Sequence, residues 1–259
     1  MKIPYYHVDS FTSQRFAGNP AGVCVLQEWL PDAVLQNIAF ENNLSETAFT
    51  VPKGDHFALR WFTPATEVDL CGHATLATAF VVFHYLGYTE PAVRFQTQSG
   101  LLTVAREGDL LVMDFPARPP APCETPEALL RGLGRQPLEV QRSRDYFAVL
   151  ATAQQVADLR PDFGELEKLD SLGVIVTAPG EQVDFVSRFF APQVGIPEDP
   201  VTGSAHSTLI PYWAQRLSKK KLTALQLSRR GGELFCEDAG ERVKIGGRAV
   251  AYLQGEIEL

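Results

Sequence analysis

The chain lacks the sequence features of several large protein classes. Its longest basic run is Lys219-Lys220-Lys221 and its net charge is −8, so we expect no broad positive face for nucleic acid. No apolar run reaches the roughly 20 residues of a membrane span, and the residues after Met1 do not form the apolar core of a signal peptide. We therefore expect no nucleic-acid partner, no membrane partner and a cytoplasmic location.

Signals for disulfides and metals are also scarce. The four cysteines are widely spaced and include no Cys-x-x-Cys pair, which indicates neither a disulfide framework nor a cysteine zinc site. The five histidines, at positions 7, 56, 73, 84 and 206, show no close spacing of metal ligands. The sequence therefore predicts no metal site.

Short runs rich in β-branched and aromatic residues are abundant, and each is bounded by Gly, Pro, Asn or Asp. These runs predict strands, and tight links such as Glu107-Gly108-Asp109 indicate antiparallel hairpins rather than crossover connections. The predicted strands are residues 5–11, 22–26, 47–51, 57–62, 93–97, 101–105 and 110–115, then 146–151, 174–177, 183–189, 233–236, 242–245 and 249–258.

A few helices are expected among the strands, including an amphipathic one at residues 31–41. The segment 73–86 is apolar nearly all round, so it must be surrounded by protein. Its counterpart, 204–217, contains Pro211, which should kink the helix or shift its start. The proline-rich segment 115–122 is the best candidate linker. We predict an α+β protein with two antiparallel, barrel-like domains, each around a helix: 1–116 and 117–259, with a C-terminal strand that could cross over.

Two stretches about half the chain apart repeat the same pattern. Residues 60–64 (RWFTP) are echoed by 188–192 (RFFAP), and 67–74 (EVDLCGHA) by 198–205 (EDPVTGSA). The Glu-to-Gly spacing is the same in both copies, 72 − 67 = 203 − 198 = 5. The repeat predicts two related half-domains, each presenting a helix N-terminus. Two such ends facing a common cleft would bind a small anionic substrate.

The glycines and hydroxyls at these helix starts have two interpretations. Gly72 and Gly203 allow a ligand to approach free backbone N–H groups, or they are simply caps. Thr202 and Ser204 add hydroxyl donors for a ligand, or they cap the helix instead.

Ionisable residues near the repeat are candidates for proton transfer. Glu46 lies between a predicted helix and a strand, where partial burial would raise its pKa towards that of a general base; alternatively, it is a surface or capping carboxylate. His73 and Asp199 lie beside the repeated glycines and so within the cleft, if it exists. There His73 would contact ligand or shuttle a proton, although a lone histidine is usually structural.

Cys71 raises a different mechanism, because a thiolate at a helix N-terminus is both stabilised and reactive. Racemases that use two thiols need one on each side of the substrate carbon. Aligning Gly72 with Gly203 places Thr202 opposite Cys71, so the second thiol is missing. A buried, inert cysteine remains the alternative for Cys71.

Five stretches of the chain form a combined pattern that is more specific than any single motif: 9–23 (DSFTSQRFAGNPAGV), 43–49 (NLSETAF), 59–77 (LRWFTPATEVDLCGHATLA), 187–205 (SRFFAPQVGIPEDPVTGSA) and 228–234 (SRRGGEL). Together they resemble the PhzF-like family, named for phenazine biosynthesis, whose fold is that of diaminopimelate epimerase. The resemblance covers essentially the whole chain, and the vertebrate phenazine-biosynthesis-like (MAWD-binding) members look especially similar near residues 228–234.

The resemblance implies two pseudo-symmetric domains with the site between them, and an isomerase that needs no cofactor. It implies that the glutamate of the SET motif, Glu46 here, moves a proton on the substrate's carbon skeleton. Authentic phenazine enzymes of the family isomerise dihydro-hydroxyanthranilate, and the family includes homodimers. Its supporting residues match His73, Asp199 and Ser204, with backbone donors at Gly72 and Gly203 and a weaker match at Asn19.

We therefore expect an isomerase that binds a small carboxylate on the paired helix N-termini of an interdomain cleft. Glu46 would remove a proton from carbon, and Glu46, His73 or Asp199 would assist its return. One rival is a binding or scaffolding protein that kept the cleft without turnover. Another is a hydrolase that uses Cys71.

Overall fold

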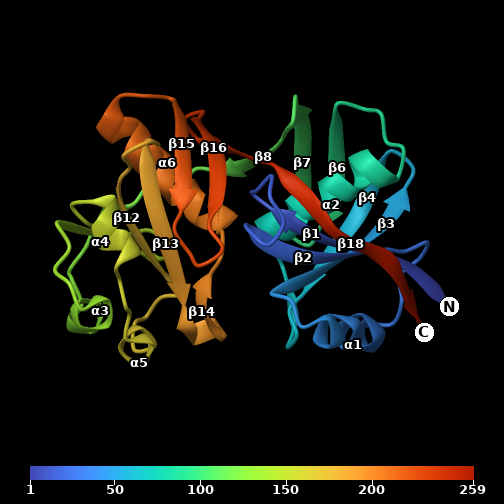
Figure 1. The fold of residues 1–259 in the computed structure, drawn as a ribbon, viewed down its shortest axis with the longest axis horizontal. Helices are drawn as coiled ribbons and strands as arrows, with labels where there is room; N and C mark the ends of the chain where they lie inside the picture. The colour runs from blue at the N-terminus through green and yellow to red at the C-terminus, as the bar shows by residue number, and fades with distance from the viewer. The chain divides into compact units, whose positions relative to one another are not determined.

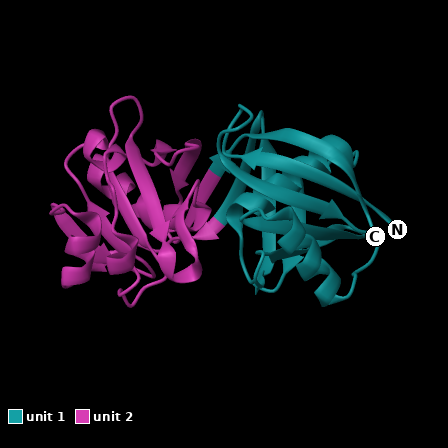
Figure 2. Ribbon diagram, turned by 60° about the horizontal axis from the view of Figure 1, so that its bottom comes forward, with its two compact units in different colours: residues 1–114, 246–259 teal, residues 115–245 magenta.

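A computed structural model describes residues 1–259 and divides the chain into two compact units. Unit 1 comprises Met1–Asp114 and Gly246–Leu259, and unit 2 comprises Phe115–Ile245 (Figure 2, teal and magenta). The last strand, β18 (Ala249–Glu258), therefore belongs to the N-terminal unit, where it pairs antiparallel with β1 (Lys2–Ser10). The C-terminal segment thus returns to the unit in which the chain begins.

Unit 1 is built on a sheet in which neighbouring strands follow the order β18, β1, β2, β3, β4, β6, β7, β8 (Figure 1). Its remaining elements are β2 (Asn19–Val25), α1 (Asp32–Asn42), β3 (Glu46–Lys53), β4 (His56–Phe62), β5 (Glu67–Val68), α2 (Gly72–Tyr85), β6 (Ala92–Thr97), β7 (Gly100–Glu107) and β8 (Leu110–Pro116).

Unit 2 repeats this design, with neighbouring strands in the order β9, β10, β11, β12, β13, β15, β16. Its elements are β9 (Ala121–Pro122), α3 (Glu127–Leu133), β10 (Glu139–Arg142), β11 (Tyr146–Val149), α4 (Ala153–Ala157), α5 (Phe163–Leu166), β12 (Val174–Pro179), β13 (Phe185–Ala191), η1 (Pro192–Val194), β14 (Ile196–Asp199), α6 (Gly203–Leu217), β15 (Lys221–Gln226), β16 (Gly232–Asp238) and β17 (Arg242–Gly247).

The duplication read from the sequence is visible in the strand pairing. In unit 1 the pairs β1–β2, β2–β3, β3–β4, β4–β6 and β6–β7 alternate between antiparallel and parallel. The pairs β10–β11, β11–β12, β12–β13, β13–β15 and β15–β16 of unit 2 alternate in the same way. The α+β class is confirmed and β7–β8 is the predicted hairpin, but the expectation of hairpins alone misses these parallel pairs. Connections that contain a helix, such as α1 between β2 and β3, are long enough to return the chain in the same direction.

Helix α2 is enclosed by unit 1, as its composition predicted. Ten of its 14 residues are buried, and it packs against β1, β2, β3 and β18. Its two buried threonines satisfy their hydroxyls locally: Thr75 donates to the carbonyl of Cys71, and Thr78 to that of Ala74. The helix can therefore be buried on all sides without leaving these hydroxyl groups unpaired.

Pro211 lies inside α6, and one of its two predicted effects, a shifted helix start, does not occur. The helix begins at Gly203, just as α2 begins at Gly72, so the proline does not shift its start. Proline has no N–H for the carbonyl four residues earlier, that of Ser207. The backbone N–H of Arg118 donates to this carbonyl at 2.8 Å instead. The proline-rich segment thus satisfies the group that Pro211 leaves unpaired. None of the helices combines the length and apolar character needed to span a membrane.

Candidate functional site

The fold brings three predicted residues of unit 1 together. Glu46 is the first residue of β3 and follows shortly after Asn43, whose left-handed conformation ends α1. Cys71 and His73 lie on either side of Gly72, the first residue of α2. Nε2 of His73 lies 3.1 Å from Oε2 of Glu46, and Nδ1 of His73 lies 3.5 Å from Sγ of Cys71. The imidazole therefore lies between a carboxylate and a thiol. Only 7% of the His73 side chain and 12% of the Glu46 side chain are exposed.

The charges in this cluster follow from its burial and contacts. Burial lowers the pKa of His73, but its contacts with Cys71 and Glu46 outweigh burial and hold that pKa well above its usual value. Burial, reinforced by the charge of Glu46, raises the pKa of the Cys71 thiol. The raised pKa of His73 favours an imidazolium at neutral pH, and the raised pKa of Cys71 favours a protonated thiol. A protonated thiol is a poor nucleophile, which disfavours Cys71 in that role.

Glu46 and His73 lie within ion-pair distance of each other but do not form a well-aligned hydrogen bond. Oε2 of Glu46 and Nε2 of His73 are both buried, and neither has a hydrogen-bond partner of acceptable geometry. Buried polar atoms are normally paired, and exceptions call for an explanation. An acceptor and a donor that do not satisfy each other remain available to a third atom, such as the reacting carbon and its proton.

One atom from each of Glu46, Cys71 and His73 lies within 4.8 Å of the others, a grouping of metal-ligand types that spacing along the chain could not reveal. The two ring nitrogens of His73 face different partners, Nε2 towards Glu46 and Nδ1 towards Cys71.

Asn19 lies close to the same cluster. It is fully buried at the start of β2 and is paired in register with Ser10, whose hydroxyl donates to the carbonyl of His73 at 2.8 Å. The loop between these two strands is strained, because Phe11 has a φ of 62° and Phe16 one of 71°. At Gly18 a Cβ would lie 2.1 Å from the carbonyl oxygen of Ser10, so only glycine fits there.

The predicted residues of unit 2 gather at the start of α6. Thr202 does not cap the helix with its side chain; its hydroxyl donates to Oδ2 of Asp199 instead. Gln226, which lies in no recognised motif of the sequence, holds this turn in place. Its Oε1 accepts from the N–H of Thr202 at 2.8 Å, and its Nε2 donates to the carbonyl of Asp199 at 2.8 Å. Gly203 and Ser204 follow in the first turn, whose N–H groups have no acceptor within the helix.

The repeated Arg and Glu residues form an ion pair in each unit. Arg60 binds Glu67 through two hydrogen bonds of 2.7 Å, and Arg188 binds Glu198 through bonds of 2.6 and 2.9 Å. Each pair ties the strand that carries the arginine to the segment leading into the buried helix. The spacing repeated in the two halves of the chain thus has a structural cause, because each ion pair positions the start of a helix.

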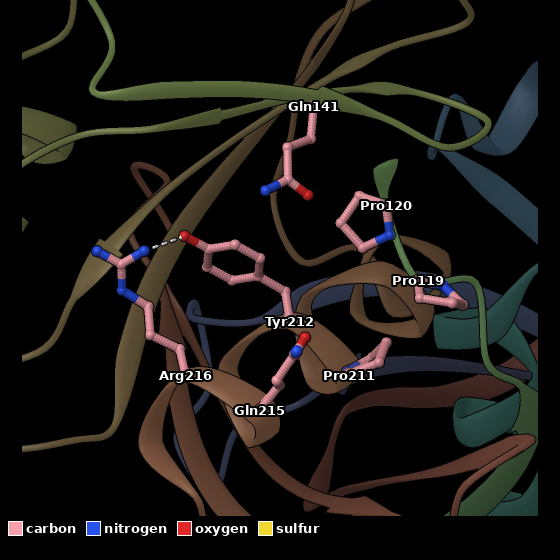
Figure 3. A pocket seen from close by; sticks show the side chains of 7 residues that line it. All are labelled: Pro119, Pro120, Gln141, Pro211, Tyr212, Gln215 and Arg216. Carbon is pink, nitrogen blue, oxygen red and sulfur yellow. Dashed lines mark hydrogen bonds between the residues drawn. The ribbon is translucent and has the colours of Figure 1, made fainter. Parts of the chain in front are cut away.

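Unit 2 also has a surface pocket of about 300 Å³, shown in Figure 3, which none of the predicted site residues lines. Burial raises the pKa of Tyr212 to about 12, its hydroxyl donates to Glu139, and Arg216 donates to the same hydroxyl. No group in this pocket can exchange a proton near neutral pH, so it is not a site of acid/base chemistry. It is lined by Pro119, Pro120, Gln141, Pro211, Tyr212, Gln215 and Arg216.

Comparisons with known proteins agree with the resemblance. Residues 8–255 match the family model described as phenazine biosynthesis-like protein. An uncharacterized isomerase from Pseudomonas aeruginosa is 54% identical over the full length of both chains. The mouse phenazine biosynthesis-like domain-containing protein 1 is 41% identical over 99% of each chain. The crystal structure of a PhzF-family protein from Enterococcus faecalis superposes with a TM-score of 0.98 at 52% identity, covering all of both chains.

Proposed function

The chain belongs to the phenazine biosynthesis-like family, and we propose that it moves a proton on the carbon skeleton of a small carboxylic acid. Its full-length relatives in bacteria are named isomerases, and it is an enzyme of that class. We assign the proton transfer to Glu46 and His73 of unit 1. In unit 2, we assign the binding of a carboxylate to the first turn of α6, with Asp199 and Thr202 shaping that turn.

The observation that carries the proposal is the unpaired contact between Glu46 and His73. A carboxylate acceptor and an imidazolium donor, 3.1 Å apart, are both buried without a well-aligned hydrogen bond. Oε2 of Glu46 would take the proton from carbon, and the electrons of the broken C–H bond would move into the conjugated system of the substrate. The proton returns at a second carbon, from Glu46 itself or from Nε2 of His73.

Cys71 has no catalytic step in this proposal. Its thiol is protonated at neutral pH because burial raises its pKa, and Thr202 stands at the equivalent place in unit 2. We propose that its sulfur contacts Nδ1 of His73 and so helps orient the imidazole, as second partners of catalytic histidines commonly do.

The test is solvent exchange in heavy water, followed by proton NMR. Dihydro-hydroxyanthranilate and a panel of small amino and hydroxy acids would be incubated with the wild type and with Glu46→Gln. We expect deuterium to enter at carbon only with the wild type, because general base catalysis supplies about 10²–10⁴-fold. Absence of exchange in every compound that binds would instead indicate a binding protein without turnover.

A further inference from the structure

We propose that Arg144 makes the carboxylate site selective for a fully ionised ligand, by presenting a guanidinium edge at the first turn of α6. Arg144 lies in the loop 143–145 that joins β10 to β11, far from the repeated motifs in sequence. The inference rests on the proposed function, because that function assigns the binding of a carboxylate to this turn.

The contact that supports it is between Arg144 and Ser204. Nη2 of Arg144 donates to Oγ of Ser204 at 3.3 Å. Because the serine oxygen accepts this bond, its own O–H proton is left to donate to a ligand. Nη1 of Arg144 makes no hydrogen bond within the protein, since only Nε and Nη2 have partners. Two donors, Nη1–H and the Ser204 hydroxyl, are thus available next to the N–H groups of the helix.

A buried carboxylate holds the guanidinium in place. Oδ2 of Asp145 accepts from Nε and Nη2 of Arg144 at 3.1 and 2.8 Å. The Asp145 side chain is only 3% exposed and its Oδ1 is buried without any hydrogen bond, whereas the Arg144 side chain is 35% exposed. An unpaired carboxylate oxygen can only accept hydrogen bonds and so offers no contact to an anionic ligand; the role of Asp145 is to anchor the guanidinium through Oδ2. The ion pair presents its positive end outward, beside Ser204.

Unit 1 differs at the equivalent place. His73 follows Gly72 as Ser204 follows Gly203, and the hydroxyl of Ser10, at the end of β1, donates to the His73 carbonyl. The cation of unit 1 is His73 itself, which gains and loses a proton. The cation of unit 2 is an arginine, which stays charged at every working pH. Unit 1 is therefore suited to moving a proton and unit 2 to recognising fixed negative charge.

The ligand class follows from the donors. A carboxylate offers two anionic oxygens that can accept from Nη1–H, from the Ser204 hydroxyl and from the helix N–H groups together. A carboxamide of the same shape has one acceptor oxygen, and its NH₂ group would face these donors. Hydrogen bonds to charged groups are stronger by an amount that corresponds to about 10- to 100-fold in affinity. We expect Arg144 to supply that discrimination.

The experiment uses acetate and acetamide as probes and does not require the natural substrate. ¹⁵N-labelled protein would be titrated with each, and the backbone amide signals of Ser204 and Ala205 would be followed. We expect acetate to bind the wild type about 10- to 100-fold more tightly than acetamide. In Arg144→Gln the affinity for acetate should fall about tenfold while that for acetamide stays nearly unchanged, and in Arg144→Lys the loss should be smaller, because the charge remains but the fork does not.

The matched control is Arg131→Gln, which removes a surface guanidinium that pairs with Glu127 and Glu165 on unit 2. It lowers the net charge of the protein equally and should leave the affinity for acetate unchanged. Unchanged acetate binding in Arg144→Gln and Arg144→Lys would overturn the inference, as would wild-type Ser204 and Ala205 signals that do not move with acetate. The amide spectrum of each variant also reports whether it is folded, and Arg144→Lys keeps a charge beside Asp145 should Arg144→Gln unfold.

The outcome separates this inference from the proposed function. Glu46→Gln should bind acetate like the wild type, because Glu46 takes no part in holding the carboxylate. If Glu46→Gln loses solvent exchange but acetate binds equally well with and without Arg144, the proton-transfer role of Glu46 stands and the role of Arg144 is refuted. If acetate binding depends on Arg144 but the wild type exchanges no proton, the role of Arg144 stands and the proton-transfer role is refuted.

Discussion

Replacing Gln226 by Glu tests how the turn before α6 is held. Gln226 is 1% exposed and makes three hydrogen bonds: it accepts from the N–H of Thr202, and it donates to the carbonyl of Asp199 at 2.8 Å and to the Thr202 hydroxyl at 3.1 Å. An ionised glutamate has the same shape but cannot donate, so both donated bonds are lost. A protonated glutamate keeps one donor and one acceptor.

The cost of Gln226→Glu should therefore depend on pH. Two lost hydrogen bonds cost about 0.5–1.5 kcal/mol each, and placing a carboxylate in this buried position adds further cost, for a total of about 3–4 kcal/mol when it is ionised. Such a carboxyl has a folded pKa above its unfolded value. The unfolded state then releases the proton first, so the variant is most stable at low pH and loses stability as pH rises towards the folded pKa.

The assay is urea unfolding followed by circular dichroism at pH 5 and pH 8, for the wild type, Gln226→Glu and Gln226→Leu. After subtraction of the wild-type pH dependence, Gln226→Glu should lose about 2–4 kcal/mol of unfolding free energy between the two pH values. Gln226→Leu should be destabilised equally at both, since leucine does not titrate. A Gln226→Glu protein whose stability relative to the wild type is the same at pH 5 and pH 8 would refute the assignment of these hydrogen bonds.

Three further predictions concern the duplicated ion pair and the acid/base cluster. Arg188→Met should lower the free energy of unfolding by about 3–5 kcal/mol, and Arg60→Met should lower it by less. The reason is that Arg188 is more buried than Arg60 and also donates to the carbonyls of Val156 and Leu159. Equal losses for the two variants in urea unfolding would contradict this comparison. Cys71→Ser should retain solvent exchange within about tenfold, since a protonated thiol performs no step; a loss of about 10³-fold would restore the thiol mechanism. The exchange rate should persist through neutral pH and fall on the alkaline side as His73, whose pKa is raised, loses its proton; a fall centred near the ordinary histidine pKa of about 6.5 would show that the imidazolium is not required.

The features that the sequence predicted were those encoded by repetition and by periodicity. The spacing from Glu67 to Gly72 and from Glu198 to Gly203 located both helix starts, and the apolar residues of α2 predicted its burial. Both signals are local, since each lies within a single stretch of chain. The parallel pairs and the short strands were missed because they depend on partners distant in the chain, or, like β10 (EVQR), carry little apolar pattern.

The candidate site depends more than the fold on contacts that the sequence does not show. Glu46 and His73 were each selected, but nothing in their spacing shows that β3 and α2 bring them within 3.1 Å. Gln226 and Arg144 contact the start of α6 from distant parts of the chain, and neither stands in a motif. A buried glutamine at the end of a strand and an Arg-Asp dipeptide in a loop are common in sequences, so only the folded structure distinguishes them.

The most direct test of the account compares Glu46→Gln with Glu41→Gln in heavy water, on the substrate that the wild type exchanges fastest. Glu41 is an exposed carboxylate on α1, close in sequence and equal in charge. The account predicts that Glu46→Gln lowers the rate of exchange by about 10²-fold or more, with the dissociation constant of the substrate nearly unchanged, and that Glu41→Gln exchanges like the wild type. Exchange by Glu46→Gln at the wild-type rate would contradict the assignment of the base.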